Sequence, residues 1–398
     1  MIKKLRDTDF LILAHACFKV SDLMARIFLT LFLYKILESN LYMLGIYYVI
    51  VYFTVTPTYA IIRKISDGKN MVNMYKLSLF MLFLYYSSVF GFIDYISNNI
   101  YLFAVFHGVS VGLYWYTYEV IVYKLSEEGS VAKFLAKQSF VMQLIKIFVP
   151  VTLGYVIYSE SYRMAILIIA IMLFIAFLLV GMIKRKVIIK NDEKLIETFN
   201  KSLLDKRQFK VYLLNFIYGF TIGGIFVRLV GVFMYLKVNS EFVYGILESV
   251  GAILIAMVLL LFNARNNMNK LNKIIVYLMF FVLCIAIIGV NISSIFIWSL
   301  LFLILTVLIA LMDLFIYTKS FEVPKSNNIN ALNYFVFNQG SMDIGRLIGY
   351  LAFAAINLYM TESEIIYLGV LCFMLMIYSV YIISVGFVEK RKDIASGF

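Results

Sequence analysis

The sequence predicts an all-α polytopic membrane protein with twelve transmembrane helices in two pseudo-symmetric six-helix bundles. Composition, the apolar runs along the chain and the placement of basic residues each indicate this fold class. Of the 398 residues, 63% are apolar and only 15% are charged, whereas soluble globular proteins have about 45–50% apolar and about 25% charged residues. So large an apolar share is typical of a chain that lies in lipid.

Twelve runs are long enough to cross a bilayer, which takes roughly 20 mostly apolar residues. Backbone polar groups in hydrocarbon must be hydrogen-bonded within the segment, so each run is predicted to be a helix. The first run is too long for a signal peptide and carries no cleavage site, so it is expected to remain as a span. In order, the runs cover residues 10–35, 43–62, 73–93, 99–123, 138–158, 164–183, 211–236, 242–262, 274–291, 294–317, 332–355 and 365–387.

Basic residues alternate between the two sides of these spans. With the N-terminus inside, most of the 35 Lys and Arg residues fall in cytosolic segments, and the outer loops hold only Lys35, Arg163 and Lys237. This is the positive-inside pattern of a cell-membrane protein, and it predicts that both termini are cytoplasmic. The surplus of basic charge is therefore expected to face anionic membrane lipid rather than nucleic acid.

The most polar segment, 184–210, follows the sixth run. It predicts an N-terminal six-helix bundle over 1–183, a cytosolic linker over 184–210 and a C-terminal six-helix bundle over 211–398. Two short echoes relate the halves at nearly equal offsets: "RIFLTLFLYK" at 26–35 with "RLVGVFMYLK" at 228–237, and "MQLIK" at 142–146 with "MDIGR" at 342–346. Such a repeat is how many transporters place one central site between two halves.

This organisation resembles the major facilitator superfamily, in its twelve-span bacterial type. The family carries a Gly- and Asp-containing basic motif between spans 2 and 3, and here that loop reads "RKISDGKN" at 63–70. Asp67 matches the motif's Asp, whereas Arg63 and Asn70 replace its two glycines. Asn70 is expected to supply the left-handed turn that a glycine would adopt.

The resemblance implies several further features. Asp67, Lys64 and Lys69 would form a cytosolic latch with span 11 and with Glu119 on span 4. Span 1 would line a central cavity worked by alternating access. "VPVTLG" at 149–154 partly matches a Gly-Pro motif of family exporters, which favours export, although the preceding Gly is missing and the spacing is altered. Gly-x-x-x-Gly pairs, which favour close helix packing, occur at Gly108/Gly112, Gly219/Gly223 and Gly345/Gly349.

Span 1 carries four ionisable residues in "AHACFKVSDLMARIF" at 14–28: His15, Lys19, Asp22 and Arg26. Their helical spacing places them on one stripe. A charge near the bilayer midplane costs roughly 2.5–3.5 kcal/mol or more, so this stripe is expected to face the protein interior or a water-filled cavity.

Other spans carry charges at similar depth: Lys146, Arg228, Asp343 and Arg346. By the internal repeat, Arg26 mirrors Arg228 and Lys146 mirrors Arg346, so these cations are predicted to converge on one central anion site. Some organic-phosphate carriers of the family use an Arg on span 1 and an Arg on span 7 in this way. The substrate-binding candidates are Arg26, Arg228, Lys146, Arg346, Lys19 and Trp115, and the proton-coupling candidates are Asp22, Asp343 and His15.

A structural alternative remains open for the same charges. Asp22 and Arg26 are four residues apart and Asp343 and Arg346 are three apart, so each pair could neutralise itself along its own helix. In that case the charges would hold the bundle together and bind nothing.

The predicted function is secondary active transport of a small organic solute, proton-coupled and with an anionic or zwitterionic substrate. No ATPase loop, His-Glu-x-x-His site or nucleophile elbow occurs, so an enzyme is not expected. The three cysteines show no metal-ligand spacing, so no metal or cofactor is expected. The chain is expected to act as a monomer. The alternatives are a lipid-linked sugar or lipid flippase and, from another class, a non-transporting membrane sensor or assembly partner that keeps the fold.

Overall fold

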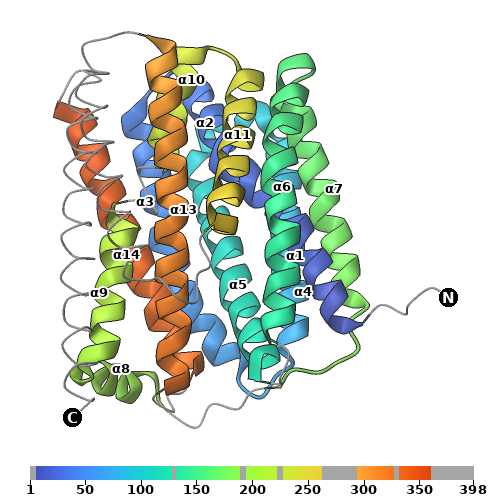
Figure 1. Cartoon of the computed structure of the whole chain (residues 1–398), viewed down its shortest axis with the longest axis vertical. Coiled ribbons are helices and arrows are strands. Elements are labelled where there is room, and N and C mark those ends of the chain that lie inside the picture. The colour runs from blue at the N-terminus through green and yellow to red at the C-terminus, as the bar shows by residue number, and fades with distance from the viewer. Residues whose placement is uncertain are drawn as a thin grey trace.

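A computed structural model describes residues 6–127, 131–188, 194–221, 227–261, 294–326 and 331–359. Within these ranges the regular elements are helices, and the long ones run side by side along the long axis of the molecule (Figure 1). The all-helical prediction is therefore confirmed. Five of the described helices contain a segment long and apolar enough to cross a membrane.

Ten of the twelve predicted spans coincide with described helices. The first is divided into α1 (Asp7–Met24), a π-helical segment η1 (Ala25–Leu29) and α2 (Thr30–Ile36). Spans 2 to 6 are α3 (Leu41–Ser66), α4 (Met71–Gly91), α5 (Ile100–Glu127), α6 (Val131–Ser159) and α7 (Tyr162–Gly181), with short 3₁₀ turns η2 (Ile93–Tyr95) and η3 (Ser97–Asn99) before α5.

The second half begins with a short helix, α8 (Leu195–Leu204), in the predicted linker. Span 7 includes most of α9 (Lys206–Phe220) and α10 (Val227–Val238), and spans 8, 10 and 11 are α11 (Glu241–Leu261), α13 (Ile295–Ser326) and α14 (Ala331–Tyr359). The predicted spans at 274–291 and 365–387 lie outside the described residues.

The π-helical segment corrects the expectation of one regular helix through span 1. It covers Ala25–Leu29 and therefore begins one residue before Arg26. A π-helical turn adds a residue to the helical repeat and is often found at functional sites. Arg26 nevertheless keeps its ion pair with Asp22, four residues earlier in the chain.

Similar turns follow the first and seventh spans. In the first turn Ser39 has φ +65°, and the side chain of Asn40 caps α3 by accepting from the Met43 amide at 3.0 Å. In the second, Asn239 has φ +52°, and Ser240 Oγ accepts from the Val243 amide at 3.4 Å. A left-handed residue followed by an N-cap thus occurs at the same place in both halves.

The most extensive packing between the halves is that of α3 against α14 and of α6 against α11. Within each half, small residues permit close approach, as predicted for two of the glycine pairs. A Cβ at Gly108 would collide with the Val51 carbonyl and Thr54 of α3, and one at Gly345 would collide with the Phe216 carbonyl of α9. These helices can pack at their observed separation only because both positions are glycine.

The first residues of the predicted linker are fastened to the loop between α3 and α4. Val187 donates its amide to Asn70 Oδ1 at 2.9 Å, and its carbonyl accepts from the Met71 amide at 2.8 Å. Asn70 has φ −74° and caps α4, whereas Gly68 has φ +67°. The expectation that Asn70 adopts the left-handed turn is therefore wrong, because its side chain is used to cap a helix and Gly68 supplies the turn.

Candidate functional site

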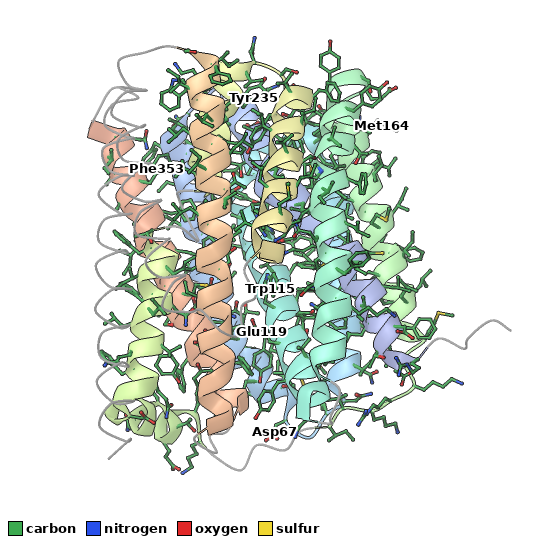
Figure 2. The ribbon with its side chains drawn as sticks, in the orientation of Figure 1. Asp67, Trp115, Glu119, Met164, Tyr235 and Phe353 are labelled. Carbon is green, nitrogen blue, oxygen red and sulfur yellow. The ribbon has the colours of Figure 1, made fainter. Side chains whose placement is uncertain are left out.

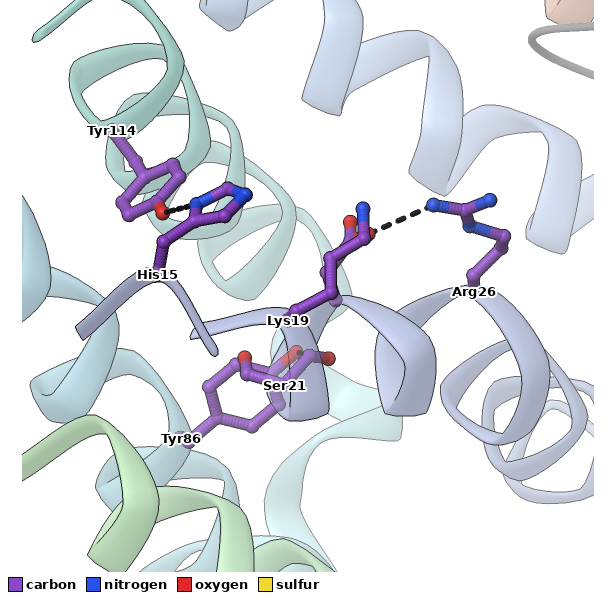
Figure 3. Close-up of polar contacts among 7 residues, drawn as sticks. His15, Lys19, Ser21, Arg26, Tyr86 and Tyr114 are labelled. Atoms are coloured by element: carbon purple, nitrogen blue, oxygen red, sulfur yellow. Dashed lines mark hydrogen bonds and ion pairs between the residues drawn. The ribbon is translucent and has the colours of Figure 1, made fainter. Parts of the chain in front are cut away.

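Three side chains of the predicted stripe in span 1 form one compact group. Asp22 Oδ2 lies 2.6 Å from Lys19 Nζ and 2.8 Å from Arg26 Nη2. Figure 3 shows Lys19 and Arg26 projecting on the same side of the helix. Asp22 is thus held between two cations, which is the intrahelical pairing of the structural alternative.

Two further helices bring charges to this group. Asp313 on α13 interacts electrostatically with Lys19, Arg26 and Lys146, and the hydroxyl of Tyr218 on α9 donates to Asp313 Oδ1. We call Lys19, Asp22, Arg26, Lys146, Tyr218 and Asp313 the central cluster. It draws on both halves of the chain, since Lys146 lies on α6 and Asp313 on α13.

Lys146 differs from the other cations of the central cluster. In the described part of the chain its ammonium group has no hydrogen-bond or ion-pair partner, although Lys19, Arg26, Asp22 and Asp313 all act on it electrostatically. Lys19 is also placed over the Trp115 ring, 5.6 Å from its centroid. The cluster therefore presents an uncommitted ammonium group together with an aromatic surface.

A second group of polar residues lies between α5, α3 and α14, and we call it the interface cluster: Tyr59, Glu119, Gln339, Asp343 and Arg346. Arg346 Nη1 lies 2.6 Å from Asp343 Oδ1, and the Tyr59 hydroxyl donates to Asp343 Oδ2 at 2.8 Å. The Gln339 amide donates to Glu119 Oε1. Tyr59 and Glu119 come from the first half and the other three from the second, so this cluster joins the two halves.

The predicted cations whose side chains are described fall in two neighbouring clusters, and their role as one anion site stays a prediction. Lys19, Arg26 and Lys146 belong to the central cluster, whereas Arg346 pairs with Asp343 and lies 5.4 Å from the Tyr52 ring centroid. The clusters are neighbours, since Tyr218 interacts electrostatically with both Arg26 and Arg346. The side chain of Arg228 lies outside the described residues, so its predicted role stays a prediction.

His15 lies apart from the ion pairs of span 1, in a buried aromatic group. Its Nδ1 is 2.6 Å from the Tyr114 hydroxyl, and its ring stacks on Tyr118 at a centroid distance of 3.9 Å. Figure 3 shows His15 directed toward Tyr114 and away from Arg26. This packing accounts for a buried histidine without a proton relay, and the relay stays a prediction.

The loop predicted to form a latch lies at one end of the molecule, which we call the linker end. Lys64, Asp67 and Lys69 are exposed there. Figure 2 shows Asp67 at this end, with Glu119 nearer mid-length beside Trp115 and Tyr235 toward the opposite end. Glu119 bonds to Gln339 of α14. The latch between Asp67 and Glu119 therefore stays a prediction. Arg63, at the start of the motif, does contact α14: its Nε lies 2.5 Å from Asn333 Oδ1.

No family profile matches the chain, and no curated protein matches its sequence. Solved transporters match its structure. A bacterial homologue of the iron transporter ferroportin, in an inward-facing state, gives a TM-score of 0.68 at 14% identity and covers 96% of this chain and 99% of its own. The nucleoside transporter NupG gives 0.67 at 13% identity, covering 98% of each chain. Both have the fold of the major facilitator superfamily.

The chain has the major facilitator fold. The predicted resemblance is thereby confirmed at the level of fold. The outward-facing ferroportin homologue with soaked iron also matches, with a TM-score of 0.64 at 16% identity and coverage of 96% of this chain and 99% of its own. At such identities the match concerns the arrangement of helices.

Within this major facilitator fold, sequence reasoning missed Tyr218, Gln339 and Tyr59 as members of the polar clusters, and it left Asp313 without a role. Asp313 was detectable, because an acid in a span is expected to face a partner. The other three are uncharged, and tyrosine and glutamine occur at many positions without such a role. Their partners lie at sequence separations of 95, 220 and 284 residues.

Proposed function

We propose that this protein is a secondary active transporter that carries a small organic anion by alternating access and couples its movement to protons. The described helices have the fold of known transporters, and the central cluster lies where residues of both halves meet. In the same proposal the linker end faces the cytoplasm, the protein is a multi-pass monomer of the cell membrane in a bacterium, and transport runs outward.

The observation that carries this proposal is the state of Lys146. Lys19 and Arg26 are already bound to Asp22 at 2.6 and 2.8 Å, so neither is free to neutralise a substrate without breaking an ion pair. Lys146 has no such partner among the described residues. An ammonium group at this depth is costly unless it is paired or hydrated, and a carboxylate or phosphate of the substrate would pair with it.

Trp115 supports an organic substrate rather than an inorganic anion. Its ring is half-buried and forms one wall beside Lys19. Binding sites for small molecules combine apolar and aromatic walls with a few placed polar groups. Lys146 would bind the anionic group, and Trp115 would contact the apolar part.

The test is a solute screen in proteoliposomes that contain the purified protein, with an imposed pH gradient. The panel comprises radiolabelled monocarboxylates, dicarboxylates, phosphate monoesters, zwitterionic amino acids and nucleosides. We expect an anionic solute to accumulate, and Lys146→Met to abolish its accumulation. Lys76→Met is the matched control, because Lys76 lies over the Phe177 ring at 4.8 Å, away from the central cluster.

Two results would contradict the proposal. One is transport of uncharged nucleosides alone, since they offer no anion for Lys146. The other is undiminished transport of the anionic solute by a folded Lys146→Met protein. A loss of transport in Lys76→Met as well would indicate that removing any intramembrane lysine impairs the protein, and the assignment of Lys146 would then fail.

A further inference from the structure

One carboxylate of the interface cluster has no ion-pair partner among the described residues. Glu119 on α5 is only 6% exposed, and the Gln339 amide donates to its Oε1. Its second oxygen, Oε2, is buried and has no hydrogen-bond partner in the described part of the chain. Buried carboxylate oxygens are ordinarily hydrogen-bonded, because an ionised oxygen without a partner is strongly disfavoured in a medium of low polarity.

The two acids that the sequence named as proton-coupling candidates are differently placed. Asp22 is held by two cations, Lys19 and Arg26. Asp343 pairs with Arg346 through Oδ1 and accepts from Tyr59 through Oδ2. Both therefore have partners that stabilise the ionised form. Glu119 receives a single amide hydrogen bond in the described part of the chain.

The groups that act on Glu119 come from two helices. On α14 they are Asp343, Arg346 and Tyr334, and on α3 the group is Tyr59. Arg346 is bound to Asp343, so the cation of this cluster is already paired with a carboxylate other than Glu119.

We propose that Glu119 is the proton-binding carboxylate of this transporter, and that it carries its proton on Oε2 while α5 and α14 are packed together. This assignment rests on the proposed transport function and replaces Asp22 and Asp343 in the coupling role. The proton is released to water on one side of the membrane when the two halves separate at this interface, and another is taken up from water on the opposite side before they close.

The position of Glu119 links the proton to movement of the halves. Its partner Gln339 lies on α14 of the second half, so the interface cluster closes only when α5 and α14 approach. A neutral Glu119 permits that approach, whereas an ionised one would bring two carboxylates together with a single arginine. Hydration on separation favours the ionised form, so closing and opening of this interface would be accompanied by proton uptake and release.

The proton can be observed without a substrate, by infrared difference spectroscopy of the purified protein in lipid over a series of pH values. The wild type should show the carbonyl stretch of a protonated carboxyl group, shifted by D₂O. Glu119→Gln should remove this band, whereas Asp22→Asn should retain it. Gln339→Met should keep the band but change its frequency, because the hydrogen bond to Oε1 is lost.

The Gln339→Met arm also applies if Glu119→Gln fails to fold. A band that is unchanged in frequency in that variant, or a band that disappears in Asp22→Asn and persists in Glu119→Gln, would overturn the assignment.

A second measurement uses the anionic solute identified by the proteoliposome screen. Glu119→Gln should lose accumulation driven by the pH gradient but retain exchange of labelled for unlabelled solute. Undiminished pH-driven accumulation by Glu119→Gln would refute the proton site while leaving the transport function intact. If the wild type transports nothing, the transport function fails, and the infrared band still decides whether Glu119 binds a proton.

Discussion

Lys35 Nζ lies 2.5 Å from Glu241 Oε1, and this ion pair joins the first half of the chain to the second at the end opposite the linker. The Tyr162 hydroxyl donates to the same oxygen at 3.0 Å, and the Tyr235 ring lies under the ammonium group at 4.9 Å. Four helices, α2, α7, α10 and α11, therefore meet around one buried carboxylate. If the halves separate at this end during transport, this contact must break.

Lys35→Met should increase opening at that end. The Lys35 side chain is 41% exposed, so we expect an effect of about 1 kcal/mol, or about a fivefold larger open fraction. The three native cysteines are first replaced by serine, and Phe28→Cys is introduced because Phe28 faces Tyr244 across the halves. The measurement is the rate at which a membrane-impermeant maleimide labels this cysteine. Arg163→Met is the control, because Arg163 contacts Phe90 within one half. Equal rates in both variants would exclude a role for the ion pair in closure.

Asp22→Asn should destabilise the protein by about 3 kcal/mol, because it leaves Lys19 and Arg26 without their common partner. Removing Arg26 as well, in Asp22→Asn with Arg26→Gln, should recover part of this loss. Thermal unfolding in detergent measures both variants. Recovery of stability together with full transport in the double variant would mean that the ion pair of span 1 only supports the fold. Recovery of stability without transport would indicate that Arg26 also serves the substrate.

Asn333 joins three elements at the linker end, and Asn333→Leu should loosen them. Its Oδ1 accepts from Arg63 at 2.5 Å and its Nδ2 donates to Thr198 of α8 at 2.7 Å. Losing buried hydrogen bonds costs about 1–3 kcal/mol, so amide hydrogen exchange in α8 should accelerate at least about fivefold. Asn357→Leu is the control on the same helix, because its amide bonds to the Phe353 carbonyl of α14 itself. Unchanged exchange in Asn333→Leu would contradict this role.

The contact between Asp9 and Lys137 predicts a dependence of stability on pH. Lys137 Nζ donates to Asp9 Oδ1 at 2.6 Å and so joins the start of α1 to α6. This hydrogen bond is the main reason that the pKa of Asp9, at the membrane boundary, lies below its ordinary value. Because the pKa is lowered on folding, ionised Asp9 stabilises the folded protein at any pH above its unfolded-state pKa of about 3.9. This stabilisation is lost as the pH falls through the folded-state pKa.

Thermal unfolding of wild type and Asp9→Asn over a pH series tests this. The difference in unfolding temperature between them should be constant near neutral pH and should shrink only in acid. A difference that persists in acid would point to a cause other than the charge of Asp9. Lys137→Met should reproduce the effect of Asp9→Asn, and combining the two should add little.

Local pattern was sufficient to predict most of the described helices. Ten of the twelve apolar runs of span length coincide with described helices, because hydrocarbon leaves the backbone no other partner. The pairing of Asp22 with Arg26 and of Asp343 with Arg346 was also predictable, since residues three and four apart share a face of one helix. The π-helical segment at Arg26 was not, because no residue in "ARIFL" marks it in the way that proline marks a kink.

Tertiary structure decided which charges meet. Internal symmetry suggested one site of four cations, but packing placed Arg346 in the interface cluster beside α3 and left Lys146 without a direct partner in the described residues. Gln339 and Glu119 are 220 residues apart and Tyr59 and Asp343 are 284 apart. Hydrophobic periodicity specifies which face of each helix is buried. It does not specify which buried faces pack against one another, because that depends on how the side chains of all the helices fit together.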